Sequence, residues 1–417
     1  PEGRRAGRHR CADIRAEAAS YDYCSRCYEG GYLRGGPEEA SAGLGGSGEY
    51  KVFLRSTWTA WSTLGEMKRV PDPTGSADIF EGRGFLGETR LEQFHLEVHR
   101  GKLKQVLQPI SKRASQRIRI GAPTEKAAPG LHWLLDGHTD GVPQGTAYRI
   151  RFEWGEEGFV VTWTPEGAAD EEESQRCRHK YFLVSSISGW VPHIGTNDKD
   201  DKSAWRWFLG HIPASGKVEL MFVRDEDMSQ MIYPAKHCPK EESVPAVGPD
   251  EGGDGRRWLV WGEEGEQMIV NLRVHDGRIE VTLITKSMGG MAFTGSTDRT
   301  YHVWSHQQLS PMRRDQERPD VWRTRCTIGE AGREEFQIWA NENPNLRIYP
   351  AGGGSPGQDL ACGPDRKGLR KFWQLAGPPG SSLEIVLDLG AEDQCRMVTC
   401  RPCTSLEGAP RQEALPQ

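Results

Sequence analysis

Residues 223–235 read VRDEDMSQMIYPA and residues 341–351 read NENPNLRIYPA, so the phrase Ile-Tyr-Pro-Ala occurs twice. A weaker version, GKLKQVLQPI, occupies residues 101–110. Proline has no N–H to donate to a sheet, and each of these phrases therefore predicts the end of a strand. One strand end that recurs at three places indicates that the chain is built from internal repeats.

A tryptophan follows each of the three phrases at nearly constant spacing. The intervals from proline to tryptophan are 24, 24 and 23 residues, and a glycine lies four positions after each tryptophan. The residues are Pro109, Trp133 and Gly137; Pro234, Trp258 and Gly262; and Pro350, Trp373 and Gly377. Between proline and tryptophan lie the related phrases IGAP (120–123), VGPD (247–250) and CGPD (362–365). This order, found three times, predicts a triplicated unit.

Each copy contains short runs in which apolar and polar residues alternate, the pattern of half-buried strands. The stretch HDGRIEVTLI (275–284) adds an Asp-Gly pair between two such runs, which predicts a hairpin. Six to eight short strands in about 110 residues are typical of a β-sandwich. We therefore predict an all-β fold of three tandem immunoglobulin-like β-sandwich repeats.

The stretches between the copies look like connectors. EGAADEEESQR (166–176) is acidic, and SMGGMAFTGSTDR (287–299) is rich in glycine and irregular. Because each copy is large enough to bury its own core, we expect separate domains arranged like beads. The predicted organisation is a Cys-containing, Gly-rich N-terminal segment at 1–48, β-sandwich repeats at 49–166, 178–287 and 299–404, and a tail at 405–417.

The beginnings of the first two copies, KVFLRSTWTAW (51–61) and KYFLVSSISGW (180–190), place a tryptophan eight positions after a strand phenylalanine. An aromatic strand, AWRWFLG (204–210), follows in the second copy. This order resembles the glycogen- and starch-binding modules attached to branching enzymes and energy-sensing kinases, in which a sugar ring stacks on tryptophan. The resemblance implies carbohydrate-binding positions at Trp61, Trp190 and Trp205. It also implies a third copy that binds sugar weakly or not at all, because Pro311 stands where the tryptophan should be.

Two roles stay open for Trp61 and Trp190, a place in the core or a sugar platform. For Trp133, Trp258 and Trp373 we expect the core, because burying a tryptophan stabilises a fold by roughly 3 kcal/mol or more.

The phrase YDYCSRCYEGG (21–31) resembles the closing half of a ZZ-type zinc finger. Two cysteines separated by two residues suit tetrahedral zinc, because the short loop directs both sulfur atoms at one ion. The resemblance implies Cys24 and Cys27 as metal ligands, with Cys11 as a third. However, Ile14 stands where the family has a further cysteine, so residues 1–48 do not complete a site. Zinc is the one cofactor that the sequence suggests.

Composition excludes several classes of function. A net charge of −6 and a pI near 6.1 argue against nucleic acid as a partner, and no apolar run is long enough to span a membrane. The ten cysteines are scattered, which favours a reducing intracellular compartment without identifying it.

No catalytic motif is present in the sequence, and we do not expect an enzyme. The sequence predicts a non-catalytic repeat protein that acts as a protein-interaction scaffold or as a structural subunit of a larger assembly. The alternative is glucan binding, to starch or glycogen, through the first two repeats.

Overall fold

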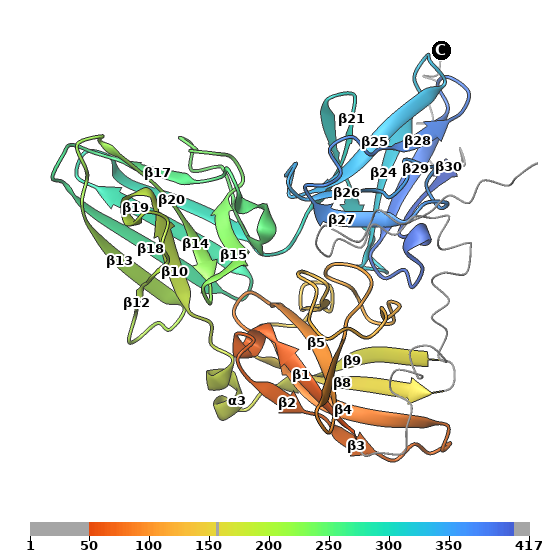
Figure 1. Ribbon diagram of the computed structural model, residues 1–417. Coiled ribbons are helices and arrows are strands. Elements are labelled where there is room, and N and C mark those ends of the chain that lie inside the picture. The colour runs from red at the N-terminus through yellow and green to blue at the C-terminus, as the bar shows by residue number, and fades with distance from the viewer. Residues whose placement is uncertain (1–49, 156–157, 404–417) are drawn as a thin grey trace, which may run out of the picture.

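The computed structural model describes residues 50–155 and 158–403, and nearly all of their regular structure is β-strand, which confirms the all-β prediction. The strands form three successive segments, at residues 51–168, 181–296 and 301–402, called here the first, second and third segments. Each has a hydrophobic core of its own. Figure 1 shows the segments at the corners of a triangle, so that each lies beside the other two. Among the described residues, no helix is long and apolar enough to cross a membrane.

The first segment contains two sheets. One has the order β2-β1-β5-β6, with β7 also paired to β5, and the other has the order β3-β4-β8-β9. The strands are β1 (Lys51–Ser56), β2 (Leu64–Glu66), β3 (Lys68–Val70), β4 (Ala77–Phe85), β5 (Leu91–Arg100), β6 (Leu103–Leu107), β7 (Trp133–Asp136), β8 (Thr146–Gly155) and β9 (Gly158–Ala168).

The second segment repeats this order within one 11-stranded sheet, β11-β10-β14-β15-β16-β20-β19-β18-β13-β12, with β17 paired to β14. Its strands are β10 (Tyr181–Ser185), β11 (His193–Ile194), β12 (Thr196–Asn197), β13 (Ala204–His211), β14 (Lys217–Arg224), β15 (Asp227–Pro234), β16 (Ala246–Asp250), β17 (Trp258–Trp261), β18 (Gln267–His275), β19 (Arg278–Thr285) and β20 (Gly289–Ser296).

The third segment again has two sheets, β22-β21-β25-β26-β27 with β28 paired to β25, and β23-β24-β29-β30. Its strands are β21 (Tyr301–Ser305), β22 (Gln308–Pro311), β23 (Arg313–Arg314), β24 (Val321–Thr327), β25 (Arg333–Ala340), β26 (Arg347–Pro350), β27 (Ala361–Asp365), β28 (Trp373–Ala376), β29 (Ser382–Asp388) and β30 (Val398–Pro402).

The recurring tryptophans occupy the same place in each segment. Each begins a short strand and pairs with the middle of β5, β14 or β25, opposite Phe94, Leu220 or Phe336. All three side chains are fully buried, which confirms that they belong to the core, and the indole N–H of each lacks a hydrogen-bond partner among the described residues. These residues are Trp133, Trp258 and Trp373.

The repeated phrases contact one another. The tyrosine of Ile-Tyr-Pro donates a hydrogen bond to the aspartate of Gly-Pro-Asp, from Tyr233 to Asp250 at 2.6 Å and from Tyr349 to Asp365 at 2.9 Å. The prolines end β15 and β26 as predicted. The glycine of Gly-Pro-Asp has a positive φ in both segments, and a Cβ there would lie about 2.1 Å from a backbone oxygen of the neighbouring strand. This contact explains why both phrases recur.

Two stretches that we expected to be connectors have regular structure. Residues 289–296 form β20, which pairs with β19 along its whole length, so the predicted irregular joint at 287–299 is wrong. The reason is close packing: a Cβ at Gly295 would lie 1.8 Å from the Ala246 oxygen, and glycine is what lets β16 approach β20. The acidic stretch holds helix α3 (Glu171–Arg176), which begins with a capping box between Asp170 and Glu173.

The predicted hairpin at 275–284 is confirmed, because β18 ends at His275, β19 begins at Arg278, and the two turn residues between them have positive φ. The bead-like arrangement is not observed. Buried polar side chains bridge the segments, and these bridges bring together the candidate site described next.

Candidate functional site

The two predicted sugar platforms lie in equivalent turns. A short 3-10 turn precedes each tryptophan, and the backbone N–H of Trp61 and Trp190 donates to Ser56 and Ser185 at 2.8 and 2.9 Å. Both residues have positive φ, 57° and 66°. The local resemblance between the two copies therefore extends to the backbone of the turn.

The rings of these tryptophans have different surroundings. Trp61 is partly buried and stacks on His95 at 5.4 Å, and it also contacts His132 at 4.6 Å. Burial lowers the pKa of His95, and it lowers the pKa of His132 to about 3, so both imidazoles are neutral at pH 7. Trp190 is 43% exposed, with the Arg257 guanidinium 5.2 Å from its ring centre. Protein groups thus occupy part of each ring surface.

Trp205 is 8% exposed and packs edge-on against Tyr181 in the core, so its ring has no face for a sugar. In the third segment Pro311 lies in β22, opposite His302. That segment instead has a partly buried aromatic group that the sequence reasoning missed, in which Trp304 stacks on Trp339 at 5.3 Å and on Phe372 at 5.8 Å. The alternation in β21 could have predicted this group, because Tyr301 and Val303 point inward and Trp304 therefore points outward.

The first and second segments meet around a buried carboxylate. Glu92 on β5 is fully buried, and its Oε1 accepts from Arg224 Nη1 at 3.2 Å and lies 2.8 Å from His179 Nε2. The other imidazole nitrogen of His179 is 2.5 Å from Asp225. Thr57 donates to the second oxygen of Glu92. We call Glu92, Arg224, His179 and Asp225 the interface cluster.

The charges of this cluster support one another. Burial alone would raise the pKa of Glu92, but the charges of Arg224 and His179 and its hydrogen bonds hold that pKa below its usual value. Burial and Arg224 would lower the pKa of His179, but the surrounding carboxylates raise it to about 10. At neutral pH the cluster therefore contains two cations and two anions, with the histidine protonated.

A sequence signal for this cluster existed. Glu92 shares the inward face of β5 with Phe94, and Arg224 shares the inward face of β14 with Phe222, so each is a charge at a core position. Glu334 occupies the place of Glu92 in the third segment and likewise accepts from the backbone N–H five residues earlier. Only Glu92 also binds a residue of another segment.

Asn343, which is fully buried, joins the third segment to the second. Its side-chain amide donates to the Tyr233 hydroxyl at 3.1 Å and to the Gly252 carbonyl at 3.0 Å. Asn345 donates to Gly252 and Asp254 beside it. These bonds fix the loop after β25 against the repeated Tyr-Asp pair of the second segment.

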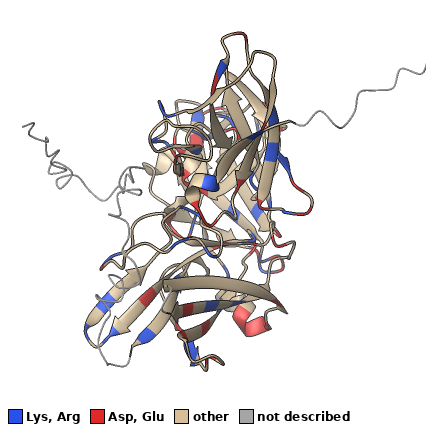
Figure 2. Cartoon of the chain, turned by 90° about the vertical axis from the view of Figure 1, so that its right-hand side faces the viewer, with Lys and Arg blue, Asp and Glu red and all other residues tan. Residues whose placement is uncertain are grey.

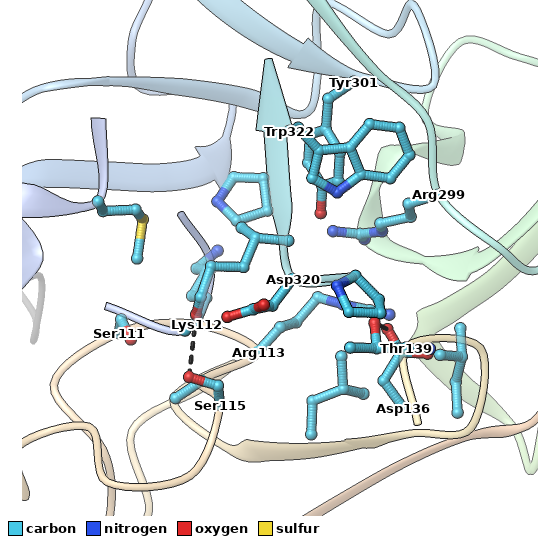
Figure 3. Close-up of a pocket in the computed structure, with 18 of the residues that line it drawn as sticks. Ser111, Lys112, Arg113, Ser115, Asp136, Thr139, Arg299, Tyr301, Asp320 and Trp322 are labelled. Carbon is cyan, nitrogen blue, oxygen red and sulfur yellow. Dashed lines mark hydrogen bonds between the residues drawn. The ribbon is translucent and has the colours of Figure 1, made fainter. Parts of the chain in front are cut away.

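The first and third segments enclose a cavity of about 600 Å³, which we call the junction cavity. Loop 111–117 of the first segment and the connector 297–299 form part of its wall, and further residues of both segments complete it, including Trp322 on β24 and Leu389 after β29. Figure 3 shows the Arg299 guanidinium and the Tyr301 hydroxyl pointing into the same space. The Ser115 hydroxyl donates a hydrogen bond across it to the Leu389 carbonyl at 2.9 Å, and Lys112 forms an ion pair with Asp365 at 3.7 Å.

The three cysteines predicted to bind metal, Cys11, Cys24 and Cys27, lie outside the described residues. Within the described part of the chain, Glu219, His237 and Cys238 have ligand atoms within 4.8 Å of one another and could hold a metal ion. Acidic and basic residues are interspersed along the strands in Figure 2.

Comparison with known proteins identifies no relative: no family model, no curated protein and no solved structure matches this chain.

Proposed function

We propose that this chain is a non-catalytic scaffold, in which three copies of an immunoglobulin-like β-sandwich unit form one rigid body that holds loops and sheet faces for other proteins. The observation that carries the proposal is the interface cluster. A carboxylate and a guanidinium removed from water are tolerated only where the two groups are held together and their remaining hydrogen bonds are made. Each member of the cluster has its partner only while the two segments stay in contact, which supports a fixed arrangement in place of the relative motion expected of loosely linked domains.

The divergence between the segments also supports a scaffold. The outer surfaces of the three segments differ: the first carries Trp61 with two histidines, the second carries Trp190 with Arg257, and the third carries stacked tryptophans at another place on its sheet. Surfaces that differ on a common framework suit different partners at fixed separations, because rigid presentation avoids the entropic cost of ordering domains on binding.

The experiment is a pull-down from cell extract with the tagged full chain, read out by mass spectrometry. The comparison is between the wild type, Arg224→Met and the exposed control Arg278→Met. We expect proteins retained by the wild type and by Arg278→Met to be lost from Arg224→Met, and small-angle scattering to show a larger radius of gyration for that variant alone. Retention of the same proteins by a loosened Arg224→Met would contradict a role for the rigid arrangement.

Glucan binding is the second candidate, favoured by the exposure of Trp190 on a turn equivalent to that of Trp61. Sugar rings stack on exposed tryptophan faces. Sedimentation with glycogen or starch granules should fall at least tenfold in the double variant Trp61→Ala/Trp190→Ala if these residues are platforms. Trp261→Ala is the control, because Trp261 is also 43% exposed but lies outside the turn. If the wild type does not sediment with glucan, this candidate is excluded.

A further inference from the structure

The junction cavity is large enough for a small molecule. Its volume of about 600 Å³ lies within the range of roughly 300–1,000 Å³ that is usual for small-molecule sites. It is bounded by two segments far apart in sequence and by the connector between them, and such domain junctions are common places for ligands.

Asp250 lies near two guanidinium groups of the cavity wall, those of Arg113 and Arg299, but it forms an ion pair with Arg299 and not with Arg113. Arg299 binds Asp250 at 3.3 Å and is nearly buried. Arg113 is partly buried, and among the described residues it makes one weak hydrogen bond, to the Pro249 carbonyl at 3.5 Å, and no ion pair. Burial and the neighbouring charge of Arg299 lower the pKa of Arg113 to about 10, so it remains a cation at pH 7.

The carboxylates of the wall already accept hydrogen bonds from protein groups, whereas the Arg113 guanidinium has few acceptors. Asp136 accepts from the backbone and hydroxyl of Thr139, Asp140 from Tyr148, Asp298 from Arg314, and Asp320 from Arg318. The cavity therefore has unused hydrogen-bond donors and positive charge, and its acceptors are largely satisfied. Chemistry of this kind selects an oxyanion, because a guanidinium matches the two oxygens of a carboxylate or phosphate.

Much of the remaining wall is apolar. The aliphatic residues come from both segments, and the aromatic ring of Trp322 lies beside Tyr301, as Figure 3 shows. A ligand that filled this space would bury hydrocarbon as well as charge. The apolar lining residues are Leu91, Leu134, Ile348, Leu389 and Met397.

We propose that the junction cavity binds an amphiphilic organic anion, with its carboxylate or phosphate held by Arg113 and Arg299 and its apolar body between the first and third segments. This site is independent of the scaffold proposal. A bound ligand would add contacts between two segments that otherwise share few direct bonds.

The test uses the full chain and the fluorescent aromatic sulfonate 8-anilinonaphthalene-1-sulfonate, whose emission rises in apolar sites. We expect saturable binding, with displacement by octanoate or octyl phosphate at concentrations at least tenfold lower than by 1-octanol. The stronger of the two anions identifies the head group. Arg113→Gln should raise the apparent dissociation constants of probe and anions at least tenfold, and Arg325→Gln, an exposed arginine outside the cavity, should change them less than twofold.

Several outcomes would overturn the proposal. Equal displacement by octanol and octanoate would show an apolar site without anion recognition. Displacement by inorganic phosphate as effective as that by octyl phosphate would show that the apolar part of the ligand contributes nothing to binding. The proposal would also be overturned by an Arg113→Gln variant that is folded, as judged by circular dichroism, and that binds the probe and the anions like the wild type. If that variant does not fold, the octanoate and octanol comparison on the wild type decides the question.

Discussion

The first segment meets its two neighbours in opposite ways. Against the second segment it buries a complete set of charges, in which Glu92 is bound by Arg224 and His179 and no cation lacks a carboxylate. Against the third segment it leaves the junction cavity, in whose wall Arg113 has no ion-pair partner among the described residues. The comparison shows that one contact pairs every charge that it buries, whereas the other leaves a guanidinium in a cavity wall without an ion pair among the described residues.

The largest expected effect comes from breaking the interface cluster between the first and second segments. Arg224→Met leaves Glu92 buried beside fewer donors, and removing one partner of a buried ion pair costs about 3–5 kcal/mol. We expect that loss in the free energy of unfolding of the variant, measured by urea titration. The double variant Glu92→Leu/Arg224→Met should recover most of it, because no uncompensated charge remains.

The matched control for that variant is Arg278→Met, an exposed arginine on the same segment, which should change stability by less than about 0.5 kcal/mol. A similar small change in Arg224→Met would mean that the interface cluster contributes little, and the contrast between the two interfaces would disappear.

The second prediction concerns pH. The pKa of His179 is raised to about 10 in the folded state, above its unfolded value near 6.5, so its contribution to stability is complete below pH 6.5 and is lost as pH rises toward 10. A shift of this size corresponds to at most roughly 4–5 kcal/mol. We expect the stability gap between wild type and His179→Gln to shrink across this window, measured by thermal unfolding at pH 6, 8 and 10.

The exposed His193→Gln serves as the control and should leave the pH profile of stability as in the wild type. A gap for His179→Gln that stayed constant from pH 6 to pH 10 would contradict a proton held between Glu92 and Asp225.

The third prediction replaces an arginine by methionine at the junction cavity, between the first and third segments. Arg113→Met removes a partly buried cation that lies near Arg299 and makes no ion pair among the described residues, so in the absence of ligand it should be neutral or stabilise the fold by about 1 kcal/mol. The absence of a stability loss in Arg113→Met, against the large loss in Arg224→Met, is the sharpest test of the comparison. Urea titration of both variants in the same buffer measures it, and a loss above 2 kcal/mol would show that Arg113 has a structural role.

The smallest effect distinguishes two serines at the cavity. Ser115 donates to the Leu389 carbonyl across the interface, and its replacement by alanine should cost about 0.5–1.5 kcal/mol. Ser111 has a buried hydroxyl without a partner among the described residues, so Ser111→Ala should be neutral or slightly stabilising. Equal losses in the two thermal melts would contradict this assignment.

Much of the strand pattern could be predicted from the residues. Trp133, Trp258 and Trp373 were expected in the core from their spacing, and Pro234 and Pro350 were expected to end strands. The glycines of residues 287–299 led to the wrong prediction of an irregular connector. A Gly-rich connector and a strand that packs closely against another strand have the same composition. Trp205 misled for a related reason, since an aromatic on an alternating strand is exposed or buried according to register.

The sequence alone determined which elements form, because alternation, proline and the Asp-Gly turn act within a few residues of one another. Only the tertiary structure decided that the three segments contact one another. It also decided that Glu92 binds Arg224, 132 residues later in the chain, and that Arg113 has no such partner among the described residues. Charges at core positions mark a buried contact, but the pairing depends on how whole sheets meet, which no local pattern encodes.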